Sequence, residues 1–188
     1  MAGRAPRAQL TELESCVLGA IWLRGPCSAY AIRREFAQSN SSFWSSSSGS
    51  IYPVIKRLTA LGLVSAAPKP VDKRGKRDLA ATAKGARALR GWVRDLPPWT
   101  AMPSLDPVRA RMNFLAVLGT RDGQLDFVRR AQVAARVQAV GLRRQLPAFK
   151  QASQVEYLTN LGSLHEVEAR AQWLKKVAAA LRTGGAIR

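Results

Sequence analysis

The sequence is poor in the residues that most enzymes use for chemistry. Its 188 residues include one His, two Cys and 12 Asp and Glu. Cys16 and Cys27 form no CxxC pair, so the sequence indicates neither a zinc knuckle nor a disulfide framework. It contains no GxGxxG or phosphate-binding loop, and no evident pairing of a nucleophile with a base. We therefore expect no catalytic site, no metal and no cofactor.

Long apolar runs are also missing. The longest in the first third of the chain, residues 17–23, is too short to cross a bilayer. It follows Glu12 and Glu14, an acidic flank that is wrong for a signal peptide. We expect a cytoplasmic protein without membrane contact, whose two thiols are buried and reduced.

Positive charge is what the sequence has in excess. The 30 Lys and Arg give a formal net charge of +18 and an isoelectric point near 11.4. The excess is spread over both halves, so no detachable basic tail accounts for it. A surface of this kind attracts polyanions, either nucleic acid or an acidic membrane. Nucleic acid is the first hypothesis.

Two helices are expected at the start of the chain, after a flexible basic lead-in at residues 1–9. Thr11 and Glu14 form a capping-box pattern before an amphipathic stretch that ends near Gly25. Ser28 is expected to cap the second helix, in which Tyr30 should pack in the core. Its helical pattern then stops. The segment 39–50 is nearly all serine and in isolation would pass for a flexible linker, but Phe43 and Trp44 argue against that.

A third helix is predicted from residue 51, with two different faces. One sector holds the apolar positions Ile51, Val54, Ile55, Leu58 and Leu61. The opposite sector holds Ser50, Tyr52, Pro53, Lys56 and Arg57. Since Pro fits only the first turn of a helix, Pro53 places the start near Ser50, the expected N-cap. One face packs and the other is available to a partner.

A basic hairpin and a further helix are expected next. Residues 63–67 and 78–81 can form two short strands around the basic loop 68–77, and Thr82 can cap a helix that stops before Pro97. The order of three helices, a hairpin with a basic tip and another helix is that of a winged helix-turn-helix.

The residues of this region resemble the PadR family of bacterial transcription regulators. The resemblance covers about residues 10–94, and the block Gly49-Ser50-Ile51-Tyr52-Pro53, followed by Leu58, Leu61 and Gly62-Leu63-Val64, is its most specific part. Further matches are Leu10-Thr11-Glu12-Leu13-Glu14, Val17-Leu18-Gly19, Pro26, Tyr30, Trp44, Thr82 and Lys84-Gly85. The resemblance implies a DNA-binding regulator with a helical C-terminal region that mediates dimerisation.

The remainder of the chain predicts long helices. We expect a winged helix-turn-helix domain at 10–96, a proline-rich linker at 97–107 and a helical dimerisation domain at 108–188, giving a mainly α fold with one small β-hairpin. Residues 108–118 are expected to form one helix. In two long segments further along, apolar residues recur at alternating intervals of three and four positions. This spacing indicates a narrow apolar seam, along which another helix packs. The expected dimerisation residues are Leu161, Leu164, Val167, Ala171, Leu174, Ala178 and Leu181; packing within one chain alone is the alternative.

Candidate DNA contacts follow from the exposed sector of the third helix and from the basic loop. They are Ser50, Tyr52, Lys56 and Arg57 on the helix, Lys73, Arg74, Lys76 and Arg77 on the hairpin, and Arg33 and Arg34 on the second helix. For the hairpin, the arginine pair and Arg57, a solvated surface is the alternative.

Five tryptophans also permit a small-molecule hypothesis. The resemblance allows a small aromatic or hydrophobic effector, and its candidate contacts are Trp22, Trp92, Trp99 and Trp173, for which simple packing is the alternative. His165 is expected on a helix surface or at an interface.

The sequence as a whole favours a homodimeric, sequence-specific regulator. We expect a repressor that binds a palindromic operator in double-stranded DNA. The alternative is a basic protein that binds nucleic acid without sequence preference. Sequence alone does not give the operator, the regulated genes, the effector or the direction of regulation.

Overall fold

The computed structural model describes residues 10–39, 41–70, 77–102 and 106–184. The chain divides into two compact units, Met1–Ala101 and Met102–Arg188. The fold is mainly α-helical, with one antiparallel two-stranded sheet among the described residues, as the sequence predicts.

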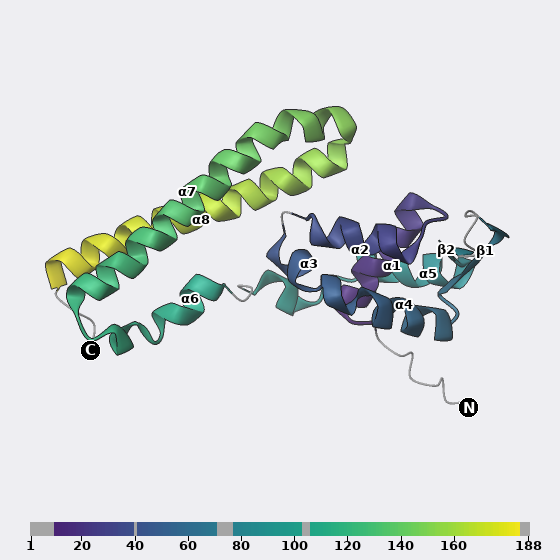
Figure 1. Cartoon of the computed structure of the whole chain (residues 1–188), viewed down its shortest axis with the longest axis horizontal. Helices are drawn as coiled ribbons and strands as arrows, with labels where there is room; N and C mark the ends of the chain where they lie inside the picture. Colours follow the sequence, from purple (N-terminus) through teal and green to yellow (C-terminus); the bar gives the residue numbers. More distant parts are fainter. Residues whose placement is uncertain (1–9, 40, 71–76, 103–105, 185–188) are drawn as a thin grey trace. The chain divides into compact units, whose positions relative to one another are not determined.

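The N-terminal unit has the element order of a winged helix-turn-helix (Figure 1). Its helices and strands are α1 (Glu12–Arg24), α2 (Ala29–Ala37), α3 (Ser42–Ser46), α4 (Ile51–Ala60), β1 (Val64–Pro70), β2 (Arg77–Ala81) and α5 (Ala83–Arg94). Two short 3₁₀ turns, η1 (Ser48–Ser50) and η2 (Pro98–Ala101), complete it.

Three helix starts are confirmed in atomic detail. The Thr11 side chain accepts from the Glu14 N–H while the Glu14 carboxylate accepts from the Thr11 N–H, which is a complete capping box. Ser28 caps α2 through the Ala31 N–H, and Thr82 caps α5 through the Gly85 N–H. These contacts satisfy backbone donors that a helix start leaves unpaired.

The core of this unit forms around α1. Its fully buried side chains include Leu18 and Ile21 of α1, Ile32 and Phe36 of α2, and Leu58 of α4. Burying a side chain of this kind contributes about 1.5–3 kcal/mol, so α4 is held to the unit by its apolar face.

The serine-rich segment differs from the expectation that helical structure stops there. Residues 42–46 form α3 and residues 48–50 form η1, which leads directly into α4. The serine hydroxyls donate to nearby carbonyls, for example from Ser47 Oγ to the Phe43 oxygen at 2.7 Å. The Trp44 ring stacks on Phe36 at 4.4 Å between centroids and anchors the segment to the core.

The hairpin is also longer than predicted, with β1 at Val64–Pro70 in place of 63–67 and β2 at Arg77–Ala81 in place of 78–81. Val64 pairs with Ala81 and Ala66 with Leu79, and the register shifts between Ala66 and Pro70. An isolated bridge joins Cys27 to Leu79, so backbone pairing supports a β2 segment of weak strand propensity.

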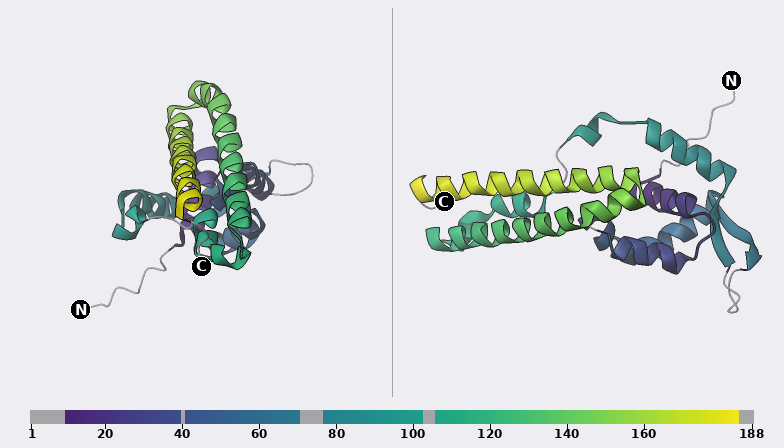
Figure 2. Two further views of the ribbon diagram at one scale, coloured as in Figure 1. Left: turned by 90° about the vertical axis from the view of Figure 1, so that its left-hand side faces the viewer. Right: turned by 90° about the horizontal axis from the view of Figure 1, so that it is seen from above.

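Helices α7 (Arg121–Ala152) and α8 (Gln154–Gly184) run side by side in opposite directions in the C-terminal unit (Figures 1 and 2). The expected single helix at 108–118 is instead α6 (Pro107–Met112) followed by the 3₁₀ turn η3 (Leu115–Leu118). The break follows Asn113, the C-cap of α6, and Gly119 ends η3 with a φ of 69°. No helix in the described ranges is long and apolar enough to cross a membrane.

The seam between α7 and α8 is an intramolecular one. Leu164 is buried with Ala139 and Leu142 of α7, while Leu174, Ala178 and Leu181 are buried with Leu115 and Val128. Close packing of this kind stabilises the pair of helices within a single chain.

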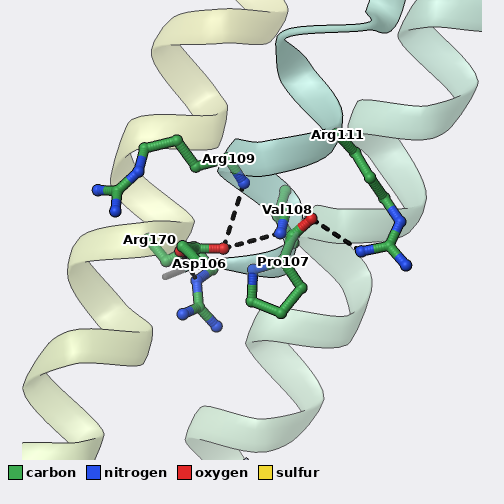
Figure 3. A network of polar contacts seen from close by, with 6 residues as sticks. All are labelled: Asp106, Pro107, Val108, Arg109, Arg111 and Arg170. Carbon is green, nitrogen blue, oxygen red and sulfur yellow. Dashed lines mark hydrogen bonds and ion pairs between the residues drawn. The ribbon is translucent and has the colours of Figure 1, made fainter. Parts of the chain in front are cut away.

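Asp106 fastens the first residues of this unit to α8 (Figure 3). Its Oδ1 accepts from the N–H groups of Val108 and Arg109, and its Oδ2 from Arg170 Nε at 2.7 Å. A single carboxylate therefore caps α6 and pairs with an arginine of α8.

Candidate nucleic-acid interface

Helix α4 presents a polar face opposite its buried one. Ile51, Ile55 and Leu58 are buried, whereas Tyr52 and Lys56 are exposed, with 49% of Tyr52 accessible. The period of the helix places residues 52 and 56 on the same side. A phenol hydroxyl and an ammonium group therefore point to solvent from one rigid element.

The start of α4 differs in detail from the sequence prediction. Ser50 is the N-cap position, but its side chain makes no capping hydrogen bond, because η1 continues into α4 with helical backbone angles. Ser50 is exposed. Its hydroxyl is thus not used in capping the helix, and the residue lies at the surface two positions before Tyr52.

The two arginines of α2 have different surroundings. The Arg33 guanidinium lies over the Tyr30 ring at 5.6 Å from its centroid and is partly buried, whereas Arg34 is exposed. Tyr30 itself is 56% exposed, so the expectation that it packs in the core is wrong. Its ring supports an arginine at the surface of the unit.

The basic tip of the hairpin falls largely outside the described residues. Lys73, Arg74 and Lys76 lie outside them; Arg77 begins β2, and its side chain is not described. The two strands that flank this loop pair as a wing adjacent in sequence to α4.

Arg57 differs from its neighbour Lys56 because it has a carboxylate partner. Its Nε lies 3.1 Å from Glu14 Oε1, and the side chains are 51% and 6% exposed respectively. The capping-box pattern identified Glu14 as a helix-start residue, but it gave no sign of this contact with α4. Long-range pairs of this kind have no local sequence signal.

The C-terminal end of α4 has further polar contacts that the sequence did not indicate. Lys84 Nζ donates to the Leu61 oxygen at 2.7 Å, and Thr82 Oγ1 donates to the Gly62 oxygen at 2.8 Å. Thr82 and Lys84 belong to the pattern that resembles the PadR family, and the structure gives them a physical role. They satisfy carbonyls at and just after the helix end.

The four tryptophans of the effector hypothesis are distributed over both units. Trp22 and Trp99 are 54% and 52% exposed, and the Trp92 indole N–H donates to Glu12 Oε1 at 3.1 Å. Trp173 packs beside the Leu174 cluster of the C-terminal unit. Two of the four side chains are therefore already engaged within their own unit.

The expected dimerisation residues lie on the inner side of α8. Leu164, Leu174, Ala178 and Leu181 are buried against α7 or its neighbours, and Leu161, Val167 and Ala171 are partly buried. An exposed apolar stripe lies instead on α7, where Val133, Val137 and Val140 are 53%, 67% and 43% accessible. Their spacing of four and three residues places them on one face.

The two cysteine thiols lie in surroundings that disfavour the thiolate. Burial, with a smaller effect of Glu12, raises the pKa of the Cys16 thiol to about 11, and burial also raises that of Cys27. A thiol that stays protonated is a weak nucleophile. His165 is exposed, and no cluster suited to a metal ion occurs in the part of the chain that the structure describes.

Comparison with known families gives a match in the N-terminal unit. Residues 17–91 match the family model described as the transcriptional regulator PadR-like family. No curated protein matches the sequence significantly.

Solved structures resemble the fold over nearly the whole chain. A crystal structure of Bacillus subtilis PadR with operator DNA has a TM-score of 0.76 and 21% identity, covering 92% of this chain and 98% of that one. The same protein with p-coumaric acid gives 0.70 and 21%, covering 90% and 98%. The Vibrio cholerae virulence activator AphA gives 0.71 and 21%, covering 93% and 100%.

Proposed function

We propose, from the premise that residues 17–91 of this chain are a PadR-like regulator domain, that the protein is a sequence-specific DNA-binding transcription regulator. The observation that carries the proposal is the two-faced helix α4, held by Ile51, Ile55 and Leu58 and exposing Tyr52 and Lys56. The recognition helix of a winged helix-turn-helix has two faces of this kind and lies in the major groove. The net charge of +18 supports attraction to the DNA backbone.

The polar face of α4 reads the DNA in this proposal. Lys56 donates to a guanine edge or a phosphate, and the hydroxyls of Tyr52 and Ser50 bond to phosphates or base edges. Arg34 and the arginine stacked on Tyr30, Arg33, contact the backbone beside α2. The wing residues Lys73, Arg74, Lys76 and Arg77 contact phosphates or enter the flanking minor groove.

A second copy of the chain completes the reading surface. One helix reads a few base pairs, whereas a symmetric dimer reads two half-sites about 34 Å apart, which multiplies the specificity. Because the inner positions of α8 already pack within the chain, the dimer contact we propose includes the exposed stripe Val133, Val137 and Val140 of α7. Burying this stripe removes apolar surface from water.

Repression by occupation of promoter DNA is the mode of regulation we propose. A small aromatic or hydrophobic effector releases the protein by changing the spacing of the two α4 helices. The structure of Bacillus subtilis PadR with p-coumaric acid supports an effector of this class for a protein of the same fold. Of the candidate residues, Trp22 and Trp99 have the most exposed rings.

Competition binding tests the proposal. The protein is titrated into fluorescent duplex DNA from its own upstream region, and unlabelled genomic DNA of unrelated sequence is added. Specific regulators bind their sites about 10³–10⁷ times more tightly than other DNA, so we expect the complex to survive a large excess of competitor.

Loss of the complex in proportion to competitor would support the alternative, a basic protein without sequence preference. The comparison should include an upstream fragment with its inverted repeat scrambled. Equal affinity for the intact and the scrambled fragment would contradict a palindromic operator.

A further inference from the structure

Glu14 is a buried carboxylate shared by two elements. Its residue is 4% exposed, in the first turn of α1. Oε2 accepts from the Thr11 N–H at 2.8 Å, and Oε1 lies 3.1 Å from Arg57 Nε of α4. A carboxylate removed from water is costly unless both oxygens are paired. The capping box pairs only Oε2 of Glu14, and Arg57 of α4 pairs Oε1.

Arg57 lies at the edge of the packed face of α4. It directly precedes Leu58, which is fully buried, and follows Lys56, which is exposed. Successive helical residues are about 100° apart around the axis, so fixing the direction of Arg57 also fixes that of Lys56. An ion pair to α1 at this position restrains rotation of α4 about its own axis.

The polar restraints on α4 are concentrated toward its C-terminal end. Lys84 and Thr82 bind the Leu61 and Gly62 oxygens, while the Ser50 side chain makes no capping bond at the other end. The exposed end that carries Tyr52 is held by the packing of Ile51 and Ile55. The orientation of the reading face thus depends on packing against α1 and α2 and on the hydrogen bonds from Thr82 and Lys84 at the start of α5.

We propose that Arg57 is a positioning residue that sets the orientation of α4 through Glu14, and that it does not contact DNA. The inference rests on the proposed function, since it specifies which cations of α4 read DNA. Arg57 keeps its carboxylate partner in the complex, whereas Lys56 meets the nucleic acid. Residues that support a reading surface act on affinity through geometry, without adding a contact of their own.

The salt dependence of binding separates the two roles. Each phosphate contact contributes about 0.9 to the slope of log affinity against log salt concentration. Anisotropy titrations at several salt concentrations should use the full chain, with Arg57→Gln, Glu14→Gln, the double variant and Lys56→Gln as the matched contact control. Lys56→Gln should weaken binding and, if Lys56 meets a phosphate, lower the slope by about 0.9.

Arg57→Gln and Glu14→Gln should each weaken binding about tenfold and leave the slope unchanged, because neither removes a DNA contact. The double variant should be no weaker than the poorer single one, since both substitutions break the same ion pair. A lowered slope for Arg57→Gln, together with unchanged binding by Glu14→Gln, would overturn the inference. Absence of DNA binding by the wild-type protein would overturn the proposed function as well.

If the Arg57 and Glu14 variants do not fold, an NMR measurement on the wild-type protein tests the same inference. In wild-type protein labelled with ¹⁵N-arginine, the Arg57 Nε–H signal should be protected from exchange and should keep its chemical shift when operator DNA is added. A large shift of that signal on DNA addition would overturn the inference without any substitution at Glu14 or Arg57.

Discussion

Individual side chains with the same charge have different surroundings in this protein. Lys56 and Arg57 are adjacent cations of α4, yet Lys56 is exposed and Arg57 pairs with a buried carboxylate. The sequence pattern places both in the polar sector, with Arg57 at its boundary. Only the tertiary structure shows the partner of Arg57, because Glu14 is 43 positions away along the chain.

The contacts of Asp106 predict that the stability of the C-terminal unit depends on pH. Burial by itself would raise its pKa, but hydrogen bonds from the Arg109 and Val108 N–H groups and the adjacent Arg170 guanidinium lower the pKa below its usual 3.8. A carboxyl with a lowered folded pKa stabilises the fold fully above its unfolded pKa. That contribution is lost as the pH falls through the folded pKa.

Asp106→Asn should therefore lower the melting temperature at pH 7, by about 4–8 °C if the loss is about 1 kcal/mol. The difference from wild type should shrink as the pH falls through the lowered pKa of Asp106, because the wild-type carboxyl is then protonated too. Thermal melts at a series of pH values, followed by circular dichroism, check this. A difference that stays the same from pH 7 into acid would show that the charge of Asp106 is not responsible.

Helix α5 depends on a glycine where it closely approaches Leu63, the residue before β1. A Cβ on Gly85 would lie 2.1 Å from the Leu63 carbonyl oxygen, which backbone atoms cannot tolerate without a shift. Gly85→Ala should destabilise the N-terminal unit by about 1–3 kcal/mol, as overpacked positions do. Denaturant unfolding followed by tryptophan fluorescence measures the change.

Gly91 is the matched control on the same helix. A Cβ there meets no atom within 4 Å, so Gly91→Ala should stabilise α5 by about 0.5–1 kcal/mol through helix propensity. Destabilisation of equal size by both substitutions would contradict the role assigned to the Gly85 approach.

Prediction from sequence succeeded for elements that carry local signals. The capping residues Thr11, Ser28 and Thr82 and the apolar period of α4 are local, and the structure confirms each helix they indicated. In the serine-rich segment, Trp44 correctly argues against a flexible linker, but the helix α3 was not predicted, because the stacking of Trp44 on Phe36 is a tertiary contact. The extension of β1 likewise depends on its pairing with β2, which strand propensity alone does not report.

At the scale of the whole molecule, we expect two copies of the chain to associate through the exposed stripe Val133, Val137 and Val140 of α7. Val137→Glu places a charge in the exposed stripe of α7, so it should convert a dimer to monomers with helix content unchanged. Sedimentation velocity and circular dichroism measure the two properties. A wild-type monomer, or a variant that remains dimeric, would contradict this contact.

Leu164→Glu is the control for that experiment. Leu164 is buried against Ala139 and Leu142 within one chain, so a charge there should disrupt the helix pair itself and reduce the helical signal. The sequence identified the correct seam residues, but their period could not show whether the partner helix lies in the same chain.

Cross-linking tests the central claim, that the exposed face of α4 lies against DNA, most directly. A photoreactive phenylalanine analogue replaces Tyr52, and the protein is irradiated with duplex DNA from its own upstream region. The same analogue at Leu23, which is 76% exposed at the end of α1, provides the comparison. We predict strong cross-linking from position 52 and little from position 23. Cross-linking from position 23 with none from position 52 would contradict the claim.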